Sequence, residues 1–308
     1  MLKALVCDPI EKSAVDILSS AGVQVDSRPT ITAEELLEAV KSYNILVVRG
    51  RTKVTSKVIE NGLPHLKIVG RAGVGLDNID LEAAAKYGVK VVNTPEAPTN
   101  AVAELVIGLM ICLARDIPRD DRVVRGGGWP KHARMGMELA GKTLGVVGFG
   151  RIGRRVAELA RAFSMSILAY DVIEIPLEVL ARTQTTITDL ETLLRSSDFV
   201  TLHVPLTQET YHMIDGVMLR MMKPTSYLIN VSRGAVVDEE ALYEALTSGW
   251  IAGAGLDVFE KEPPAGSKLL GLENVVLTPH IGAQTREAQE AAATMLAEKI
   301  LRELGLRS

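Results

Sequence analysis

The sequence predicts an α/β protein with two doubly wound parallel sheets, and three observations lead to this prediction. Short β-branched apolar runs alternate with amphipathic helical stretches from one end of the chain to the other. The runs are apolar throughout, which is typical of parallel strands that are covered by helices on both faces. The length of 308 residues exceeds that of one ordinary compact domain, so we expect two domains.

The strands fall into two series. The first series comprises the apolar runs at residues 4–7, 45–48, 67–69 and 89–92. The second comprises six runs, at residues 143–147, 166–170, 199–202, 227–230, 252–256 and 275–278. Helical patterns separate them, so each series predicts one parallel sheet with its own core.

Between the two series, residues 101–117 are apolar nearly all round, and a loop-rich stretch, RGGGWPKHARMGMELAG, follows at residues 125–141. A helix that is apolar on every side must be buried on every side. Two interpretations stay open: an interdomain helix, or a subunit interface with the loop-rich arm as a clasp. Residues 285–304 form an amphipathic pattern that predicts a C-terminal helix packed on the first domain.

Composition and charge argue against several classes of protein. A net charge of -4 predicts no basic surface for nucleic acid and no polybasic segment for a membrane. The longest apolar stretch, residues 101–114, contains Glu104 and is too short to span a bilayer. Cys7 and Cys112 lie in apolar runs without zinc-type spacing, so we expect buried thiols, no metal site and a reducing cytoplasm.

Three glycines mark a nucleotide site. Gly148, Gly150 and Gly153 have GxGxxG spacing between a strand and a helix, and the six-stranded series is what a complete dinucleotide-binding sheet needs. Such glycines permit a tight turn, close approach of a pyrophosphate and close helix packing, while the helix N-terminus supplies N–H donors. The next strand ends at Asp171, where a carboxylate binds the adenosine ribose and repels a 2′-phosphate. The pattern therefore favours NAD over NADP.

Three ionisable residues follow late strands of the second series: Arg233, Glu262 and His280. Carboxyl ends of parallel strands are where ligands bind in such sheets. Oxidation of a 2-hydroxy acid needs a base for the hydroxyl proton, which suits His280, and a cation for the carboxylate, which suits Arg233. Glu262 would fix the imidazole tautomer. Each residue alone also fits a structural or surface role, and only their common location favours catalysis.

The chain resembles the D-isomer-specific 2-hydroxyacid dehydrogenase family over essentially its whole length. The resemblance rests on GRAGVGLDNID (70–80), VAELVIGLM (102–110), GKTLGVVGFGRIGRRVA (141–157), LINVSRGAVVDEEAL (228–242), AGAGLDVFEKEPP (252–264) and LTPHIGAQTREAQ (277–289). It implies a Rossmann-type NAD domain, residues 99–284, inserted in a smaller flavodoxin-like substrate domain, residues 1–98 and 285–308. It also implies homodimers formed through the NAD domain.

The resemblance assigns further residues. It implies that Arg233, Glu262 and His280 are catalytic. It implies that the dinucleotide is lined by Arg151, Ile152, His203, Val204, Pro205, Val231, Ser232, Asp257, His280, Gly282 and Ala283, in addition to the glycines and Asp171.

The first domain indicates which acid is bound. Arg49 and Arg71 follow two strands of the first domain, and arginine pairs bind phosphate well, although Arg49 and Arg51 also fit a role in surface salt bridges. The loop after Arg71, which contains Ala72, Gly73 and Val74, can offer N–H groups to a carboxylate. The resemblance is strongest to family members that oxidise D-3-phosphoglycerate to 3-phosphohydroxypyruvate in serine synthesis. A cation from the partner subunit, Lys131 or Arg134, could complete the phosphate site.

Two alternatives and one absence complete the prediction. The alternatives are a glyoxylate or hydroxypyruvate reductase on the same scaffold, and a non-catalytic NAD-sensing binding protein like some transcriptional corepressors that share this fold. Many phosphoglycerate-oxidising members carry a C-terminal serine-binding module, whereas this sequence ends at Ser308. We therefore expect no serine inhibition by that route.

Overall fold

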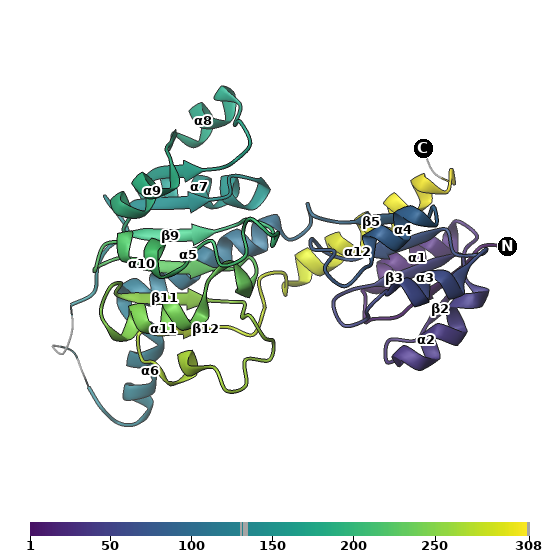
Figure 1. Ribbon diagram of the computed structural model, residues 1–308, viewed down its shortest axis with the longest axis horizontal. Helices are drawn as coiled ribbons and strands as arrows, with labels where there is room; N and C mark the ends of the chain where they lie inside the picture. Colours follow the sequence, from purple (N-terminus) through teal and green to yellow (C-terminus); the bar gives the residue numbers. More distant parts are fainter. Residues whose placement is uncertain (130, 132–134, 307–308) are drawn as a thin grey trace. The chain divides into compact units, whose positions relative to one another are not determined.

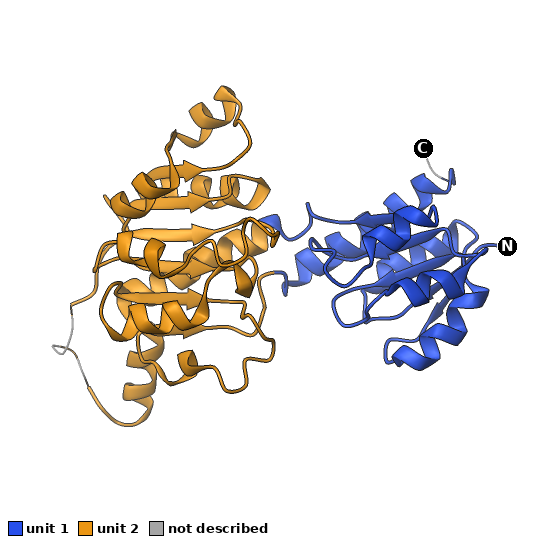
Figure 2. Cartoon of the chain, in the orientation of Figure 1, with its two compact units in different colours: residues 1–99, 283–308 blue, residues 100–282 orange. Residues whose placement is uncertain are grey.

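The computed structural model describes residues 1–129, 131 and 135–306. The chain folds into two compact units: unit 1, residues 1–99 and 283–308, and unit 2, residues 100–282 (Figure 2). Each unit contains one sheet in which every strand pairing is parallel, with helices on both faces (Figure 1). This architecture confirms the predicted fold class.

Unit 1 has a five-stranded sheet in the order β2-β1-β3-β4-β5. Its strands are β1 (Lys3–Val6), β2 (Gln24–Ser27), β3 (Ile45–Val48), β4 (Ile68–Arg71) and β5 (Lys90–Asn93), and its helices are α1 (Lys12–Ser20), α2 (Ala33–Ala39), η1 (Val40–Ser42), α3 (Ser56–Gly62), α4 (Leu81–Lys86) and α12 (Arg286–Glu303). Helices α1 and α12 share a core on one face, and α2, α3 and α4 share the other. The strand order reverses between β1 and β3, where such sheets bind ligands.

Unit 2 has a seven-stranded sheet in the order β12-β11-β10-β9-β6-β7-β8. Its strands are β6 (Thr143–Val147), β7 (Ser166–Tyr170), β8 (Thr185–Ile187), β9 (Phe199–Leu202), β10 (Tyr227–Asn230), β11 (Gly253–Leu256) and β12 (Val275–Leu277). Its helices are α5 (Thr99–Arg115), α6 (Ile117–Arg125), α7 (Arg151–Ala162), α8 (Leu177–Thr183), α9 (Leu190–Ser196), α10 (Gly216–Met221), η2 (Gly234–Val236), α11 (Glu239–Thr247) and η3 (Lys268–Gly271). Helices α5, α7 and α8 cover one face, and α9, α10 and α11 cover the other. The order reverses between β6 and β9.

The sequence missed two edge strands and one helix boundary. Strands β2 (QVDS) and β8 (TTI) are short, partly exposed and polar, so neither forms an apolar run, and the second sheet has seven strands instead of six. The single helix expected at 101–117 ends at Arg115 and is followed by α6. The two helices separate at Asp116, whose φ of 54° is left-handed and interrupts helical geometry.

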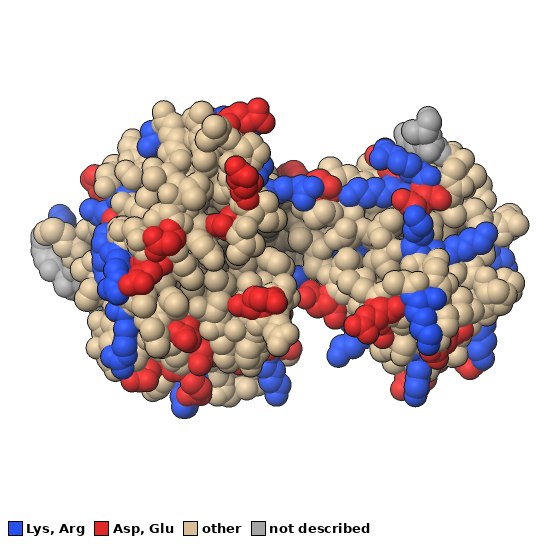
Figure 3. All heavy atoms as spheres, turned by 45° about the horizontal axis from the view of Figure 1, so that its top comes forward, with Lys and Arg blue, Asp and Glu red and all other residues tan. Residues whose placement is uncertain are grey.

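The surface carries both signs of charge. On the face shown in Figure 3, Lys and Arg side chains are intermixed with Asp and Glu side chains on each unit. Among the described residues, the structure contains no helix with the length and hydrophobicity that crossing a bilayer requires.

Candidate active site

The glycine turn joins β6 to α7 and has the form a dinucleotide phosphate needs. Gly148 has a φ of +89°, and a Cβ there would lie 2.8 Å from the carbonyl carbon of His203, which follows the neighbouring strand β9. A Cβ on Gly153 would overlap the carbonyl oxygen of Gly148. Above Gly150 the space is open, and the twelve-residue helix α7 begins at Arg151. The turn therefore leaves N–H groups of a helix N-terminus accessible to a phosphate.

Asp171 lies directly after β7 and is bonded to this turn. Its Oδ2 accepts a hydrogen bond from the N–H of Phe149 (2.6 Å), and its Oδ1 accepts one from the N–H of Ile173 (3.0 Å). Because a carboxylate has about four acceptor positions, it can still bind ribose hydroxyl groups. Its negative charge beside the turn opposes a 2′-phosphate, so these residues fit NAD.

The other predicted cofactor residues within unit 2 share this edge of the sheet. His203, Val204 and Pro205 follow β9, and Val231 and Ser232 follow β10, while Arg151 and Ile152 begin α7. Gly282 is buried against Asp257. Ala283 falls in unit 1, where its carbonyl accepts a hydrogen bond from the Gln289 side chain (2.5 Å).

His203 is a neutral base at the switch point of unit 2. Its Nε2 lies 3.1 Å from Thr201 Oγ1, and burial lowers the pKa of His203 from 6.5 to about 3. A neutral imidazole beside the glycine turn adds no positive charge to the phosphate site.

Glu262 and His280 form a hydrogen-bonded pair after β11 and β12. His280 Nδ1 lies 2.8 Å from Glu262 Oε2, and the two side chains are 51% and 39% exposed respectively. When Nδ1–H donates a hydrogen bond to the carboxylate, the lone pair of the imidazole is on Nε2, which then can take a proton from a substrate. The pair has the arrangement of a general base and its orienting carboxylate.

Asp257 holds the turn that contains His280, a role that the sequence did not reveal. This buried carboxylate accepts hydrogen bonds from Thr278 Oγ1 (2.6 Å) and from the N–H groups of Ile281 (2.8 Å) and Gly282 (2.8 Å). His280 has a left-handed φ of 55°, which costs conformational energy in a non-glycine residue. The three hydrogen bonds stabilise this strained turn. The resemblance had placed Asp257 only near the cofactor.

Arg233 lies in the turn after β10, next to the loop that contains Glu262. Asn230 organises this turn: its Nδ2 donates to the Arg233 carbonyl (2.9 Å), and its Oδ1 accepts from Ser232 N–H (3.1 Å). A Cβ on Gly234 would overlap the backbone of Phe259, so the two segments approach as closely as glycine allows. Phe259 N–H in turn donates to Glu262 Oε1 (3.2 Å). The structure therefore brings the Arg233 turn against the Glu262 loop.

In unit 1, Arg49 and Arg71 come from adjacent strands at the same edge. Arg71 Nε donates to the Arg49 carbonyl oxygen (3.2 Å), and a Cβ on Gly73 would overlap the Arg71 guanidinium. The guanidinium of Arg71 thus lies over the loop that follows it. Arg49 is half-buried, and burial lowers the pKa of its guanidinium.

The predicted carboxylate-binding N–H groups of that loop need a correction. Ala72 N–H donates to the carbonyl of Val48 (2.9 Å), and Gly73 N–H donates to Thr94 Oγ1 (2.9 Å). These bonds continue the sheet and hold the loop, so the two N–H groups are engaged within the unit. Val74 is exposed in the same loop and remains a prediction. Of the arm residues proposed as partner cations, Lys131 is exposed, whereas Arg134 lies outside the described residues.

Among the described residues, His212, Asp238 and Glu260 could together hold a metal ion, with one ligand atom from each within 4.8 Å of the others. However, His212 Nε2 lies 2.9 Å from Glu260, whereas its Nδ1 faces Asp238 at 3.9 Å. Asp238 also caps α11 through the N–H of Ala241. The two carboxylates face different ring nitrogens of His212. We therefore interpret these contacts as structural ones that connect the loops.

Comparisons with known proteins agree with this geometry. Residues 107–282 match the family described as D-isomer specific 2-hydroxyacid dehydrogenase, NAD binding domain. The chain is 49% identical over 301 residues to D-3-phosphoglycerate dehydrogenase of Methanocaldococcus jannaschii, which covers 97% of this chain but only 57% of that protein. It is 47% identical over 308 residues to hydroxypyruvate reductase of Thermotoga maritima, which covers 98% of both.

A solved structure gives the same fold. The chain superposes on Aquifex aeolicus D-lactate dehydrogenase, complexed with NAD and lactic acid, with a TM-score of 0.86 at 32% identity, covering 98% of this chain and 95% of the other. The chain therefore belongs to the D-isomer specific 2-hydroxyacid dehydrogenase family, and its cofactor is NAD. It spans little more than half the length of the phosphoglycerate dehydrogenase that it matches.

Proposed function

We propose that this member of the D-isomer specific 2-hydroxyacid dehydrogenase family oxidises D-3-phosphoglycerate to 3-phosphohydroxypyruvate, the first step of serine biosynthesis. The observation that carries the substrate is the arginine pair of unit 1, in which Arg71 is hydrogen-bonded to the backbone of Arg49. Two guanidinium groups from neighbouring strands fit the dianionic phosphate through charge-assisted hydrogen bonds. A substrate without phosphate has less need of the pair.

The reaction follows from the residues of unit 2. The glycine turn and Asp171 would hold NAD, which would supply the acceptor for the hydride that leaves C2. His280 Nε2 takes the proton of the C2 hydroxyl group as the C2–O bond becomes a carbonyl. Glu262 holds Nδ1–H, which keeps Nε2 available and stabilises the imidazolium that forms. Arg233 holds the carboxylate of the substrate through its planar guanidinium. We also propose a homodimer formed through unit 2.

The second candidate is a hydroxypyruvate or glyoxylate reductase. It is favoured by the Thermotoga maritima hydroxypyruvate reductase, which matches this chain over nearly its full length, whereas the phosphoglycerate dehydrogenase is longer. It would use the same proton transfer in reverse, with His280 donating to the forming hydroxyl group. A non-catalytic NAD-sensing protein is disfavoured by the hydrogen-bonded pair of Glu262 and His280.

Matched substrates distinguish these functions. Steady-state rates with NADH would be measured on 3-phosphohydroxypyruvate and hydroxypyruvate, which differ only by the phosphate, and with NAD on D-3-phosphoglycerate and D-glycerate. Glyoxylate and pyruvate complete the panel. We expect kcat/KM to be about tenfold or more higher for each phosphorylated substrate, because a site built for a charged group rejects analogues that lack it. Equal or higher values for hydroxypyruvate would reject the proposal in favour of the reductase.

A further inference from the structure

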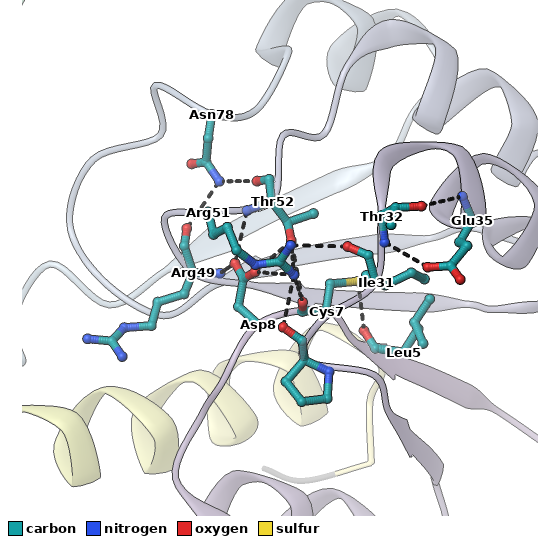
Figure 4. A network of polar contacts seen from close by, with 11 residues as sticks. Leu5, Cys7, Asp8, Ile31, Thr32, Glu35, Arg49, Arg51, Thr52 and Asn78 are labelled. Carbon is teal, nitrogen blue, oxygen red and sulfur yellow. Dashed lines mark hydrogen bonds and ion pairs between the residues drawn. The ribbon is translucent and has the colours of Figure 1, made fainter. Parts of the chain in front are cut away.

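A buried carboxylate lies at the switch point of the unit 1 sheet. Asp8 comes two residues after β1 and is 2% exposed. Its Oδ2 accepts hydrogen bonds from the N–H groups of Arg49 (2.6 Å) and Thr52 (3.3 Å), and its Oδ1 accepts one from Thr52 Oγ1 (2.6 Å) (Figure 4). Asp8 thus connects β1 to the loop that follows β3, across the point where the strand order reverses.

The two arginines of this loop have different roles. Arg51 Nη2 lies 3.2 Å from Asp8 Oδ1 and donates to the carbonyls of Cys7 (2.6 Å) and Pro29 (3.0 Å), and its Nη1 donates to that of Ile31 (3.1 Å). The guanidinium of Arg51 therefore has a structural role, because it connects these segments of unit 1. The side chain of Arg49, in contrast, points away from this network (Figure 4).

The peptide groups of Arg49 are held on both sides. Asp8 accepts from its N–H, and its carbonyl oxygen accepts from Arg71 Nε (3.2 Å) and from Asn78 Nδ2 (3.1 Å). Asn78 Nδ2 also donates to the carbonyl of Thr52 (2.7 Å), which closes the loop on itself. A shift of the Arg49 backbone would therefore move the anchor of Arg71 as well, so one network sets the position of both cations.

We propose that Asp8 is a positioning residue that holds Arg49 and Arg71 in the geometry that binds the anionic group of the substrate. The proposal rests on the proposed function for the identity of that group. An ionised carboxylate accepts only, and burying one is unfavourable unless donors surround it. Here the donors are the groups that fix the Arg49 loop. Asp8 acts through this loop and does not itself touch the substrate.

The first test is Asp8→Asn, which keeps the size of the side chain. Either orientation of the amide turns an NH2 group toward a group that can only donate, Arg49 N–H on one side or the Arg51 guanidinium on the other. With 3-phosphohydroxypyruvate and NADH, we expect KM to rise about tenfold or more while kcat stays within about threefold. Binding of NADH, measured by fluorescence titration, should be unchanged because the glycine turn lies in unit 2. Unchanged KM, or a fall confined to kcat, would overturn the proposal.

Asp26→Asn is the matched control, since it removes another carboxylate of unit 1 that is hydrogen-bonded, to Tyr43 Oη (2.6 Å). We expect its KM to equal that of the wild type. A KM increase of the same size in both variants would mean that general loss of stability, and not the Arg49 loop, causes the effect.

A double-mutant cycle separates positioning from stability. If Asp8 acts through the two arginines, Asp8→Asn should raise KM little in an Arg49→Ala/Arg71→Ala background, whereas independent effects multiply. Effects that multiply would reject the proposal.

If Asp8→Asn does not fold, Thr52→Val replaces it in the cycle. Thr52→Ser, which keeps the hydroxyl group, should then restore the wild-type KM. The same variants are also measured with hydroxypyruvate. If the wild type prefers hydroxypyruvate, the proposed substrate is wrong, but the mutant cycle measured with hydroxypyruvate still tests the role of Asp8.

Discussion

Each unit buries one aspartate at the carboxyl edge of its sheet, and the two make nearly the same contacts. Asp8 follows β1 and is 2% exposed, and Asp257 follows β11 and is 1% exposed. Each accepts a 2.6 Å hydrogen bond from a threonine hydroxyl group, that of Thr52 or Thr278. Each aspartate also accepts hydrogen bonds from two backbone N–H groups of the loop that carries a candidate site residue.

The difference lies in what each loop presents. The Asp8 loop presents Arg49 and supports Arg71, and a third guanidinium, that of Arg51, contacts the carboxylate. The Asp257 turn presents His280 in a left-handed backbone conformation. The same kind of buried acceptor thus orders the loop of a proposed binding residue in one unit and the strained turn of a proposed catalytic residue in the other. Disturbing the first should change substrate affinity, and disturbing the second should change the rate.

The largest effect should come from removing the base. We expect His280→Gln to lower kcat about 100- to 10,000-fold, because glutamine cannot accept the hydroxyl proton. NADH binding should be nearly unchanged, as measured by fluorescence titration. The matched control is His212→Gln, since His212 is also bonded to a glutamate and the amide keeps a donor toward Glu260. Comparable kcat values for His280→Gln and wild type would refute the assignment of the base.

Asp257→Asn tests the other half of the comparison. An amide would turn NH2 toward Thr278 Oγ1 and Ile281 N–H or toward Gly282 N–H, which should release the His280 turn. We expect kcat to fall about 10- to 100-fold, since misplacement of a catalytic group by about 1 Å has effects of this size. The KM of the substrate should change little. If Asp257→Asn and Asp8→Asn gave the same kinetic change, the division of roles between the units would be wrong.

Arg71→Ala tests what the unit 1 loop binds. We expect KM for 3-phosphohydroxypyruvate to rise about 10- to 100-fold, the size expected for lost charge-assisted hydrogen bonds, with a smaller change for hydroxypyruvate. Arg71→Lys keeps the charge but loses the planar group that bonds to Arg49, so an intermediate KM is expected. An equal increase for both substrates would mean that Arg71 binds the carboxylate and not the phosphate.

The sequence predicted the parts of the fold and site that depend on local pattern. Apolar runs gave the buried central strands, and the spacing of Gly148, Gly150 and Gly153 gave the turn whose close approaches the structure contains. Edge strands β2 and β8 were missed because partly exposed strands need not be apolar. The roles of Asp8 and Asp257 could not be predicted because their hydrogen-bond partners are distant in the sequence. Asp8 bonds to residues 41 and 44 positions away, and Asp257 bonds to residues 21 to 25 positions away.

The smallest expected effect concerns the switch point of unit 2, where the titratable group is the partly buried base His203 instead of a carboxylate. Because burial lowers its pKa to about 3, the unfolded chain binds one more proton than the folded chain between about pH 6.5 and 3. Folding stability from this residue is therefore present above pH 6.5 and is lost as the pH falls. Between pH 7 and 5 the free energy of unfolding, measured without cofactor, should fall by about 1–2 kcal/mol because of this residue.

The test is His203→Gln, whose side chain does not titrate. In urea unfolding at pH 7 and pH 5, the free energy of unfolding of this variant should fall less than that of the wild type, by the amount attributed to His203. Parallel losses in variant and wild type would show that His203 accepts its proton without unfolding, and that the folded structure does not lower the pKa of His203.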